Sequence, residues 1–316
     1  MDRCTGTGGE LKTTYLDRLR MSARESGSIA CMGLDPDMKA MPESFRVDDI
    51  PNFFCDIFSL MKKRGVKPAA FKPNESCYLV LDNPRDKDKS KRHMKGTQAL
   101  VEIMDLIEEY FPGSPIILDN KRGDIASTSK NYAVSGLTRW DVDAVTVHPY
   151  MGSDSVGPFI DEAMLERESR NGRGVYILNR TSNKGASDFQ NLEVKVGECL
   201  LPLYMIVQKK IIDWGRDKHG VGAVVGATSL PELKTLVALY QQYHVPLLIP
   251  GVGSQGGSAK EVMQILREEG YDLSIVRINS SSGITHPWKT RDKFPNNYSE
   301  VCVNALAKLN EEIAYK

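Results

Sequence analysis

The chain has 316 residues, and 41 lysines and arginines balance 41 aspartates and glutamates, so its formal net charge is zero. A neutral chain lacks the excess positive charge that is typical of proteins that bind nucleic acids or anionic membrane surfaces. Apolar residues make up 41% of the sequence and charged residues 26%, as in ordinary globular proteins. No apolar run approaches the roughly 18 residues of a membrane span. From the neutral charge and the absence of such a run, we expect neither a nucleic-acid partner nor a membrane partner.

The cysteines and histidines indicate no metal site. Six cysteines are scattered along the chain without a Cys-x-x-Cys pair, and the five histidines form no His-x-x-x-His or His-x-His pair. Unpaired, scattered cysteines favour a reducing, cytoplasmic compartment. Residues 1–14 are polar and lack the apolar core of a signal peptide. We therefore expect a flexible N-terminal leader over residues 1–14 and a single domain over residues 15–316.

Short β-branched apolar runs alternate with longer amphipathic stretches along the chain. Apolar residues fill these runs almost without interruption, which is typical of parallel strands covered on both faces. The expected strands are Ser28–Leu34, Pro68–Lys72, Pro115–Asp119, Val142–Val147, Gly174–Leu178, Gly222–Val225, Pro246–Pro250 and Ser274–Ile278. Helices are expected between them, for example over Gly96–Phe111, Ser153–Glu168, Leu192–Trp214, Leu230–Tyr243 and Ala259–Glu269.

The number of strands decides the predicted architecture. Eight strands that alternate with helices indicate a parallel α/β sheet, and eight is the number that closes a (β/α)8 TIM barrel. A doubly wound open sheet is the alternative. At the start of one helix, Ser229 stands three residues before Glu232, with a proline between them, which predicts a capping serine.

Charged residues gather where the third predicted strand ends. Asp119 and Lys121 are two positions apart, so on a strand they share a face, and Asp124 follows in the loop. Lys72 ends the neighbouring strand. In a barrel the reactive groups lie at the carboxyl ends of the strands, so these two lysines and two aspartates are expected to interlock at one mouth. A structural ion network is the alternative, but four such charges at strand ends favour a functional site.

A glycine-rich loop follows the seventh predicted strand. Gly251-x-Gly253-x-x-Gly256 matches the dinucleotide-binding fingerprint, but the next strand ends at Asn279 and not at the acidic residue that this fingerprint requires. The loops after the seventh and eighth strands of a barrel commonly bind phosphate. We therefore expect a phosphate site in which Gly256 and Gly257 let backbone N–H groups approach the anion.

These motifs resemble a known family. The run Asp119-x-Lys121-x-x-Asp124-Ile125 with Thr128 is similar to the D-x-K-x-x-D-I-x-x-T signature of orotidine 5'-monophosphate decarboxylases, in the longer bacterial-type branch of that family. The resemblance extends from about Ser28 to Ile284. It includes Gly33-Leu-Asp35, Lys72-Pro-Asn74, Val147-His-Pro-Tyr-Met-Gly152, Thr181-Ser-Asn183, Val224-Val-Gly-Ala-Thr228 and Pro250-Gly-Val-Gly-x-Gln-Gly-Gly257.

The resemblance implies a reaction and a role for each matching residue. The expected activity is the decarboxylation of orotidylate to uridylate without a cofactor. Lys121 is then expected to protonate the ring carbon that loses carbon dioxide, and Asp119 to lie beside the substrate carboxylate. Lys72 and Asp124 would hold both in place. The resemblance also implies that Asp35 binds the ribose, Ser182 the pyrimidine and Gln255 the phosphate. It further implies a homodimer in which Asp124, Ile125 and Thr128 enter the site of the neighbouring subunit.

One departure from the family pattern concerns the phosphate. After the eighth strand the family usually reads Ser-Arg-Gly-Ile, and that arginine binds the phosphate. Here Ser282 stands at the arginine position, followed by Gly283, and both are still expected to bind the substrate at the phosphate. Arg277 lies inside the predicted strand and out of register. The departure leaves one alternative to the decarboxylase, a nucleotide-binding barrel with impaired turnover. A related sugar-phosphate lyase is a second alternative, because sugar-phosphate barrel enzymes share the D-x-K-x-x-D core.

Overall fold

The structure, a computed structural model, describes residues 13–166, 171–253, 256–289 and 293–315. Its main sheet has eight strands in the order β2-β1-β10-β9-β8-β5-β4-β3, and every neighbouring pair along it is parallel. The strands are β1 (Ala30–Gly33), β2 (Ala70–Lys72), β3 (Ile117–Arg122), β4 (Ala144–Val147), β5 (Gly174–Arg180), β8 (Val221–Val225), β9 (Leu247–Ile249) and β10 (Val276–Ser280).

The two outer strands of this order, β2 and β3, also meet. Parallel bridges join Phe71 to Ile116 and Asn74 to Asp119, and the amide of Asp119 donates to the carbonyl of Pro73 at 2.9 Å. The sheet is therefore closed into a barrel, as predicted, whereas a doubly wound sheet would keep two open edges. All eight predicted strands are confirmed, although β3, β5 and β10 extend two or three residues beyond the predicted ends.

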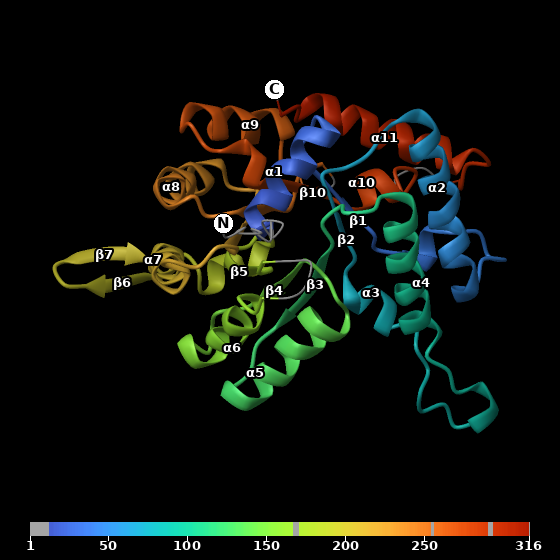
Figure 1. Cartoon of the computed structure of the whole chain (residues 1–316), viewed down its shortest axis with the longest axis horizontal. Coiled ribbons are helices and arrows are strands. Elements are labelled where there is room, and N and C mark those ends of the chain that lie inside the picture. The colour runs from blue at the N-terminus through green and yellow to red at the C-terminus, as the bar shows by residue number, and fades with distance from the viewer. Residues whose placement is uncertain (1–12, 167–170, 254–255, 290–292, 316) are drawn as a thin grey trace, which may run out of the picture.

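Helices surround the barrel (Figure 1). Each barrel strand leads into a helical segment that packs against the outside of the sheet, as the alternating pattern predicts. The helices are α1 (Tyr15–Ser26), α2 (Ile50–Arg64), α3 (Glu75–Leu79), α4 (Lys95–Tyr110), α5 (Ala126–Ala133), α6 (Ser153–Ala163), α7 (Leu203–Gly215), α8 (Leu230–Tyr240), α9 (Ala259–Glu268), α10 (Ser282–Thr285) and α11 (Tyr298–Glu312).

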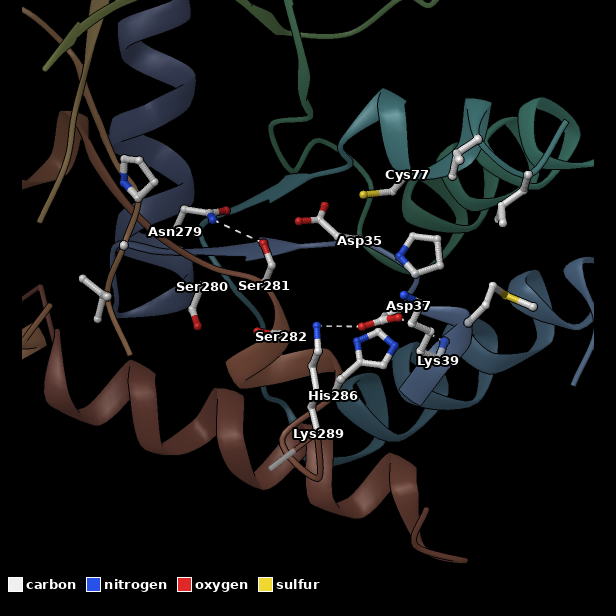
Figure 2. A pocket seen from close by; sticks show the side chains of 17 residues that line it. Asp35, Asp37, Lys39, Cys77, Asn279, Ser280, Ser281, Ser282, His286 and Lys289 are labelled. Carbon is white, nitrogen blue, oxygen red and sulfur yellow. Dashed lines mark hydrogen bonds and ion pairs between the residues drawn. The ribbon is translucent and has the colours of Figure 1, made fainter. Parts of the chain in front are cut away.

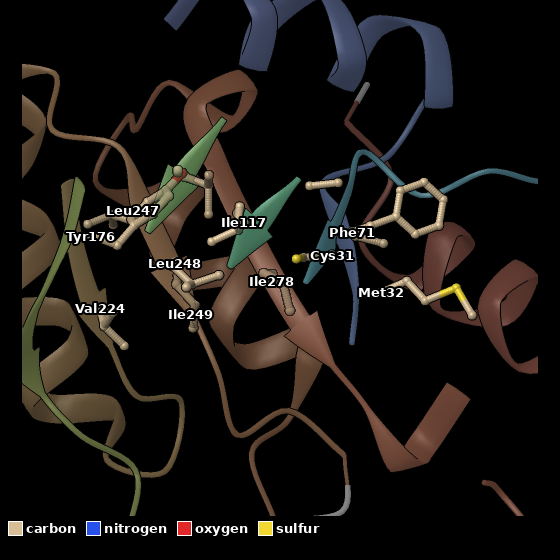
Figure 3. Packing of buried hydrophobic residues seen from close by; sticks show 14 of the residues in the cluster. Cys31, Met32, Phe71, Ile117, Tyr176, Val224, Leu247, Leu248, Ile249 and Ile278 are labelled. Carbon is tan, nitrogen blue, oxygen red and sulfur yellow. The ribbon is translucent and has the colours of Figure 1, made fainter. Parts of the chain in front are cut away.

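The core fills the barrel and the space between the strands and the helices. Strand residues such as Cys31, Phe71, Tyr176, Leu247 and Ile278 are fully buried, and Figure 3 shows that they come from different strands. This burial on both faces explains why the strand sequences are apolar without alternation.

The amino-terminal end of the barrel is closed by α1. Thr14 caps this helix through a reciprocal capping box with Asp17. Arg277 of β10 is fully buried beneath α1, where its guanidinium donates to the carbonyl of Leu19 and to the hydroxyl of Ser22, both at 2.6 Å. Arg277 therefore points away from the mouth of the barrel where the site residues were predicted.

The helix predicted over Leu192–Trp214 is wrong in its first half. Residues of this segment form an antiparallel hairpin, β6 (Glu193–Val196) and β7 (Cys199–Pro202), and only then the helix α7. Gly197, with φ of 63°, supplies the positive φ that a two-residue hairpin turn needs. Figure 1 shows the hairpin projecting from the barrel.

Two smaller predictions also differ from the structure. The helix predicted over Ser153–Glu168 ends at Ala163, before Glu166 makes a bridge to Asn171. Ser229 is the residue before α8, as predicted, but its side chain makes no capping hydrogen bond. In the part of the chain that the structure describes, none of the helices has both the length and the apolar character of a membrane span.

Candidate active site

Two ammonium groups bracket one carboxylate at the mouth of the barrel. Asp119 lies on β3, and its Oδ2 atom is 2.7 Å from the Nζ atom of Lys72 at the end of β2. Its other oxygen, Oδ1, is 2.5 Å from Nζ of Lys121 and accepts a hydrogen bond from the hydroxyl of Thr146 on β4 at 2.9 Å. Three adjacent strands thus converge on a single carboxylate.

The surroundings of Asp119 keep it ionised. Burial alone would raise the pKa of its carboxyl, but the attraction of Lys72 and Lys121 outweighs burial and holds the pKa well below the usual range. For Lys72, burial would lower the pKa of the ammonium, and the nearby carboxylates of Asp119 and Asp35 raise it instead. At neutral pH the cluster therefore contains charged groups, as an electrostatic site requires.

The two lysines differ in exposure. The side chain of Lys72 is 4% exposed, whereas that of Lys121 is 48% exposed and faces the open cleft. Lys121 also has a φ of 43°, in the left-handed region that residues other than glycine rarely adopt. Its backbone N–H donates to the hydroxyl of Thr146 at 2.9 Å, and the pairing of β3 with β4 shifts register here. Such local strain is common at functional sites.

A cavity of about 420 Å³ opens above this cluster. Asp35, in the loop after β1, lines it and accepts a hydrogen bond from the backbone N–H of Asn74 at 3.1 Å. Gly33 lets the end of β10 come close to this loop, because a Cβ atom at Gly33 would lie only 1.9 Å from the hydroxyl oxygen of Ser281. The cavity is lined by Asp35, Lys72, Asn74, Asp119, Lys121, Thr146, Leu178, Thr181, Ser182, Asn183, Val224, Leu248, Pro250, Asn279 and Ser281.

The loop after β5 forms one wall of the cavity. Ser182 is held there by Thr228, whose hydroxyl donates to the Ser182 carbonyl at 3.1 Å. Gly226 permits the approach, because an added Cβ atom would come within 2.8 Å of the Ser182 backbone. The side chain of Gln190 fixes the preceding residue, accepting from the backbone N–H of Thr181 at 2.9 Å and donating to its hydroxyl at 2.8 Å.

A second cavity, of about 510 Å³, continues the cleft past Asp35 (Figure 2). We call it the β9–β10 cavity, because the ends of these two strands form one of its walls. It shares Asp35, Pro250, Asn279 and Ser281 with the first cavity. Its other lining residues are Pro36, Asp37, Met38, Lys39, Cys77, Val80, Leu81, Gly251, Val252, Ser280, Ser282, His286 and Lys289. The two cavities together make one elongated cleft with room for a nucleotide-sized ligand.

Comparison with known proteins decides the family. The model of the orotidine 5'-phosphate decarboxylase / HUMPS family matches residues 30–287. The chain belongs to this family. Orotidine 5'-phosphate decarboxylase from Herpetosiphon aurantiacus is 34% identical over 84% of this chain and 88% of its own, and the enzyme from a Janthinobacterium strain is 34% identical over 95% and 100%.

Solved structures of the orotidine 5'-phosphate decarboxylase family share the barrel. Leishmania donovani OMP decarboxylase superposes with a TM-score of 0.67 at 27% identity, covering 95% of this chain and 98% of its own. Leishmania donovani UMP synthase gives a TM-score of 0.69 at 29% identity, but this chain covers only 56% of that longer one. A Toxoplasma gondii structure, 24% identical with a TM-score of 0.72, supports the fold.

The structure brings together some of the residues that the orotidine 5'-phosphate decarboxylase signature singled out. Lys72 and Lys121 each contact Asp119, and Asp35 and Ser182 line the same cavity. Asp124 lies outside these contacts: its carboxylate accepts from the backbone N–H of Ile125 at 2.7 Å. Ile125 is exposed and Thr128 is half-buried. Roles for Asp124, Ile125 and Thr128 at a neighbouring site remain predictions.

The glycine loop has a less direct relation to the cleft. Gly251 lines the β9–β10 cavity, but the N–H groups of Gly253, Gly256 and Gly257 donate to carbonyls within the loop itself. Gln255 lies outside the described residues. Ser282 lines the β9–β10 cavity, and Gly283 follows it in α10, where a Cβ atom would come within 2.8 Å of the Ser280 hydroxyl. Phosphate contacts by Gln255, Gly256, Gly257 and Gly283 also stay predictions.

Sequence reasoning missed two features of the site. Thr146 contacts both Asp119 and the backbone of Lys121, and the only signal was a hydroxyl residue inside an otherwise apolar strand. Glu75 directly follows Lys72-Pro-Asn74 and gave no signal in the sequence, yet its carboxylate is 2.6 Å from the guanidinium of Arg122. Among the described residues, no group of three or more histidine, cysteine or acidic side chains could hold a metal ion.

Proposed function

We propose that the chain converts orotidine 5'-monophosphate to uridine 5'-monophosphate, the last step of de novo pyrimidine nucleotide biosynthesis, as a carboxy-lyase. The observation that carries the proposal is the Lys72–Asp119–Lys121 cluster at the mouth of a barrel of the orotidine 5'-phosphate decarboxylase / HUMPS family. The curated relatives that are 34% identical over most of the chain are named as this decarboxylase. The elongated cleft has the size and polarity for a nucleotide.

The chemistry of the cluster suits this reaction. Cleavage of the bond between the ring and the carboxylate releases carbon dioxide and leaves an electron pair on the ring carbon. The Lys121 ammonium, exposed to the cleft, stabilises this negative charge electrostatically and then donates a proton to the carbon. Asp119 places negative charge next to the substrate carboxylate, and buried Lys72 keeps Asp119 ionised and in position. Solvent returns the proton to Lys121, and we assign no cofactor and no metal.

The remaining substrate contacts follow the two cavities. Asp35 would bind the ribose hydroxyls and Ser182 the pyrimidine, because both line the cavity that contains Asp119 and Lys121. The phosphate would then lie in the adjoining β9–β10 cavity, near Ser282. Barrels commonly bind phosphate at the loops after their seventh and eighth strands, which here are β9 and β10.

We also propose a homodimer in which Asp124, Ile125 and Thr128 enter the partner's site. Large apolar side chains are exposed near the ends of β3 and β4: Ile125 is 58% exposed, Tyr150 85% and Met151 43%. Exposed apolar groups of this kind mark interaction surfaces. Because the substrate is a biosynthetic nucleotide, we propose a cytoplasmic location, in line with the scattered cysteines.

The proposed activity can be tested directly. Purified protein is mixed with orotidine 5'-monophosphate in buffer that contains a chelator, and the loss of ultraviolet absorbance and the release of carbon dioxide are followed together. We expect turnover that the chelator does not reduce. Absence of both signals from a folded protein would refute the decarboxylase assignment, and turnover that stops with the chelator would refute the cofactor-free mechanism.

A further inference from the structure

The β9–β10 cavity contains few groups that could neutralise a phosphate. Its described lining residues include no arginine and only two cations, Lys39 and Lys289. Two carboxylates, Asp35 and Asp37, face the same space, and burial lowers the pKa of His286 to about 4, so that this side chain is neutral at physiological pH. A bound phosphate carries between one and two negative charges, so the affinity of the cavity for a phosphate depends on whether Lys39 or Lys289 contacts it.

Lys289 is placed for this contact by the residues just before it. His286 and Trp288 are buried, and the backbone N–H of Lys289 donates to the His286 carbonyl at 2.9 Å. The indole N–H of Trp288 donates to the carbonyl of Ala40 at 2.8 Å, which ties this turn to the loop after β1. The backbone that carries Lys289 is therefore fixed, while its side chain remains 56% exposed and able to follow a ligand.

The end of the Lys289 side chain is also oriented. Its Nζ atom lies 2.7 Å from Oδ2 of Asp37, and Figure 2 shows the ammonium on the side of the cavity where Ser282 lies. In this view Lys39 lies beyond Asp37, away from Ser282. An ammonium has three donors, so Lys289 can keep its bond to Asp37 and still donate to phosphate oxygens.

We propose that Lys289, oriented by Asp37, supplies the cation that binds the phosphate of the nucleotide in this chain. The inference rests on the proposed function, because it takes the phosphate to lie between the ends of β9 and β10 and the Lys289 turn. It assigns phosphate recognition to a residue outside the sheet, seven positions after Ser282. Asp37 serves as the positioning residue, since it holds the ammonium inside the cavity before the ligand arrives.

Calorimetric binding of uridine 5'-monophosphate and of uridine tests this assignment. We expect Lys289→Ala to weaken uridylate binding at least tenfold and to change uridine binding less than twofold, because only the phosphate contact is lost. Lys293→Ala is the matched control: Lys293 lies on the same segment, but it is not among the described residues that line the β9–β10 cavity. It should change neither affinity. Equal uridylate binding by wild type and Lys289→Ala would overturn the proposal, as would a large loss in Lys39→Ala alone.

A second comparison uses Ser282. We expect Ser282→Arg to restore uridylate binding to Lys289→Ala at least tenfold, and to improve the wild type much less, because one cation is already present. Equal gains in both backgrounds would contradict the proposal. If Lys289→Ala does not fold, Lys289→Gln is measured in the same way. Wild type that binds uridylate but does not decarboxylate orotidylate would refute the proposed function and leave the Lys289 assignment standing.

Discussion

Asp119 contacts two lysines that have different surroundings, and the difference assigns them different tasks. The ammonium of Lys72 is buried and shielded from water, so its positive charge depends on the Asp119 carboxylate for stabilisation. Lys121 is half exposed and can turn from Asp119 toward a ligand in the cleft. We therefore expect replacement of Lys72 to affect folding and replacement of Lys121 to affect chemistry.

The first prediction compares these two lysines. Lys121→Ala should lower kcat by more than about tenfold, which corresponds to roughly 1.4 kcal/mol, because the proton donor is lost. Its free energy of unfolding should change little, since Asp119 keeps Lys72 as a partner. Lys72→Ala should cost about 3 kcal/mol, because removal of one partner leaves a buried charge. Steady-state kinetics and urea denaturation give both quantities, and retention of more than a tenth of kcat by Lys121→Ala would refute its role.

A second prediction concerns pH. Burial lowers the pKa of His286 to about 4, below its value of about 6.5 in the unfolded chain. Above a pH of about 6.5, His286 is neutral in both states and the fold has its full stability. As the pH falls from there toward the folded-state pKa of about 4, the unfolded chain takes up a proton that the folded protein resists, so stability is lost. Between pH 7 and pH 5 we expect the free energy of unfolding to fall by about 2 kcal/mol from this residue.

His286→Phe should remove this part of the pH dependence, because phenylalanine does not titrate and can keep the stacking on Phe53. Denaturation curves of both proteins at pH 7 and pH 5 make the comparison. Parallel losses of stability in the two proteins would show that other groups cause the acid sensitivity.

At the scale of elements, an ion pair joins the strand ends that carry the two lysines. Glu75, the first residue of α3, follows Lys72 by three positions, and Arg122 directly follows Lys121. Their side chains meet at 2.6 Å, and the Arg122 guanidinium also lies over the ring of Tyr132. This second connection between β2 and β3 holds the turn in which Lys121 has its positive φ.

Glu75→Gln should therefore lower kcat by about tenfold with little change in KM, because displacement of a reacting group by about 1 Å can cost up to 10²-fold. Glu25→Gln, which removes an exposed carboxylate from the ion pair with Lys67, is the control and should leave kcat unchanged. The double variant Glu75→Arg, Arg122→Glu should recover part of the lost rate. An unchanged kcat with a lower melting temperature would mean that the ion pair is only structural.

The sequence predicted the strands of the barrel better than the details around them. Continuous apolar runs predicted all eight strands, because burial on both faces leaves a strong local pattern. The hairpin at Glu193–Pro202 was missed, although the alternation of Glu193-Val-Lys-Val196 before Gly197 is a strand signal. The helical pattern of α7, which follows directly, was extended over these residues and led to the wrong prediction of one continuous helix.

In the candidate site, too, some residues could be predicted from the sequence and others could not. Lys72, Asp119 and Lys121 were predicted because strand ends converge at one mouth of a barrel. Thr146 and Lys289 could not be predicted in this way, since their contacts depend on a shift in strand register and on a turn after the last barrel strand. Such contacts join distant residues and leave no periodic pattern.

At the scale of the whole molecule, the proposed dimer predicts that each site needs two chains. Lys121→Ala and Asp124→Ala would each be inactive as pure proteins. Mixed dimers should regain activity, because one of their two sites would combine an intact Lys121 with an intact Asp124. Activity is measured after subunit exchange, which is monitored with two differently tagged chains. Full exchange without any recovery would show that each chain builds its own site.

The buried guanidinium of Arg277 bears on how small the folding unit can be. The family model begins at residue 30, after α1 has ended. However, α1 supplies the Leu19 carbonyl and the Ser22 hydroxyl that hold Arg277 in the interior of the barrel. A fragment trimmed to the residues that the family model matches would take both acceptors away from this guanidinium, which we expect to cost several kcal/mol. We therefore expect a fragment that folds on its own to need α1 in addition to the residues that the family model matches.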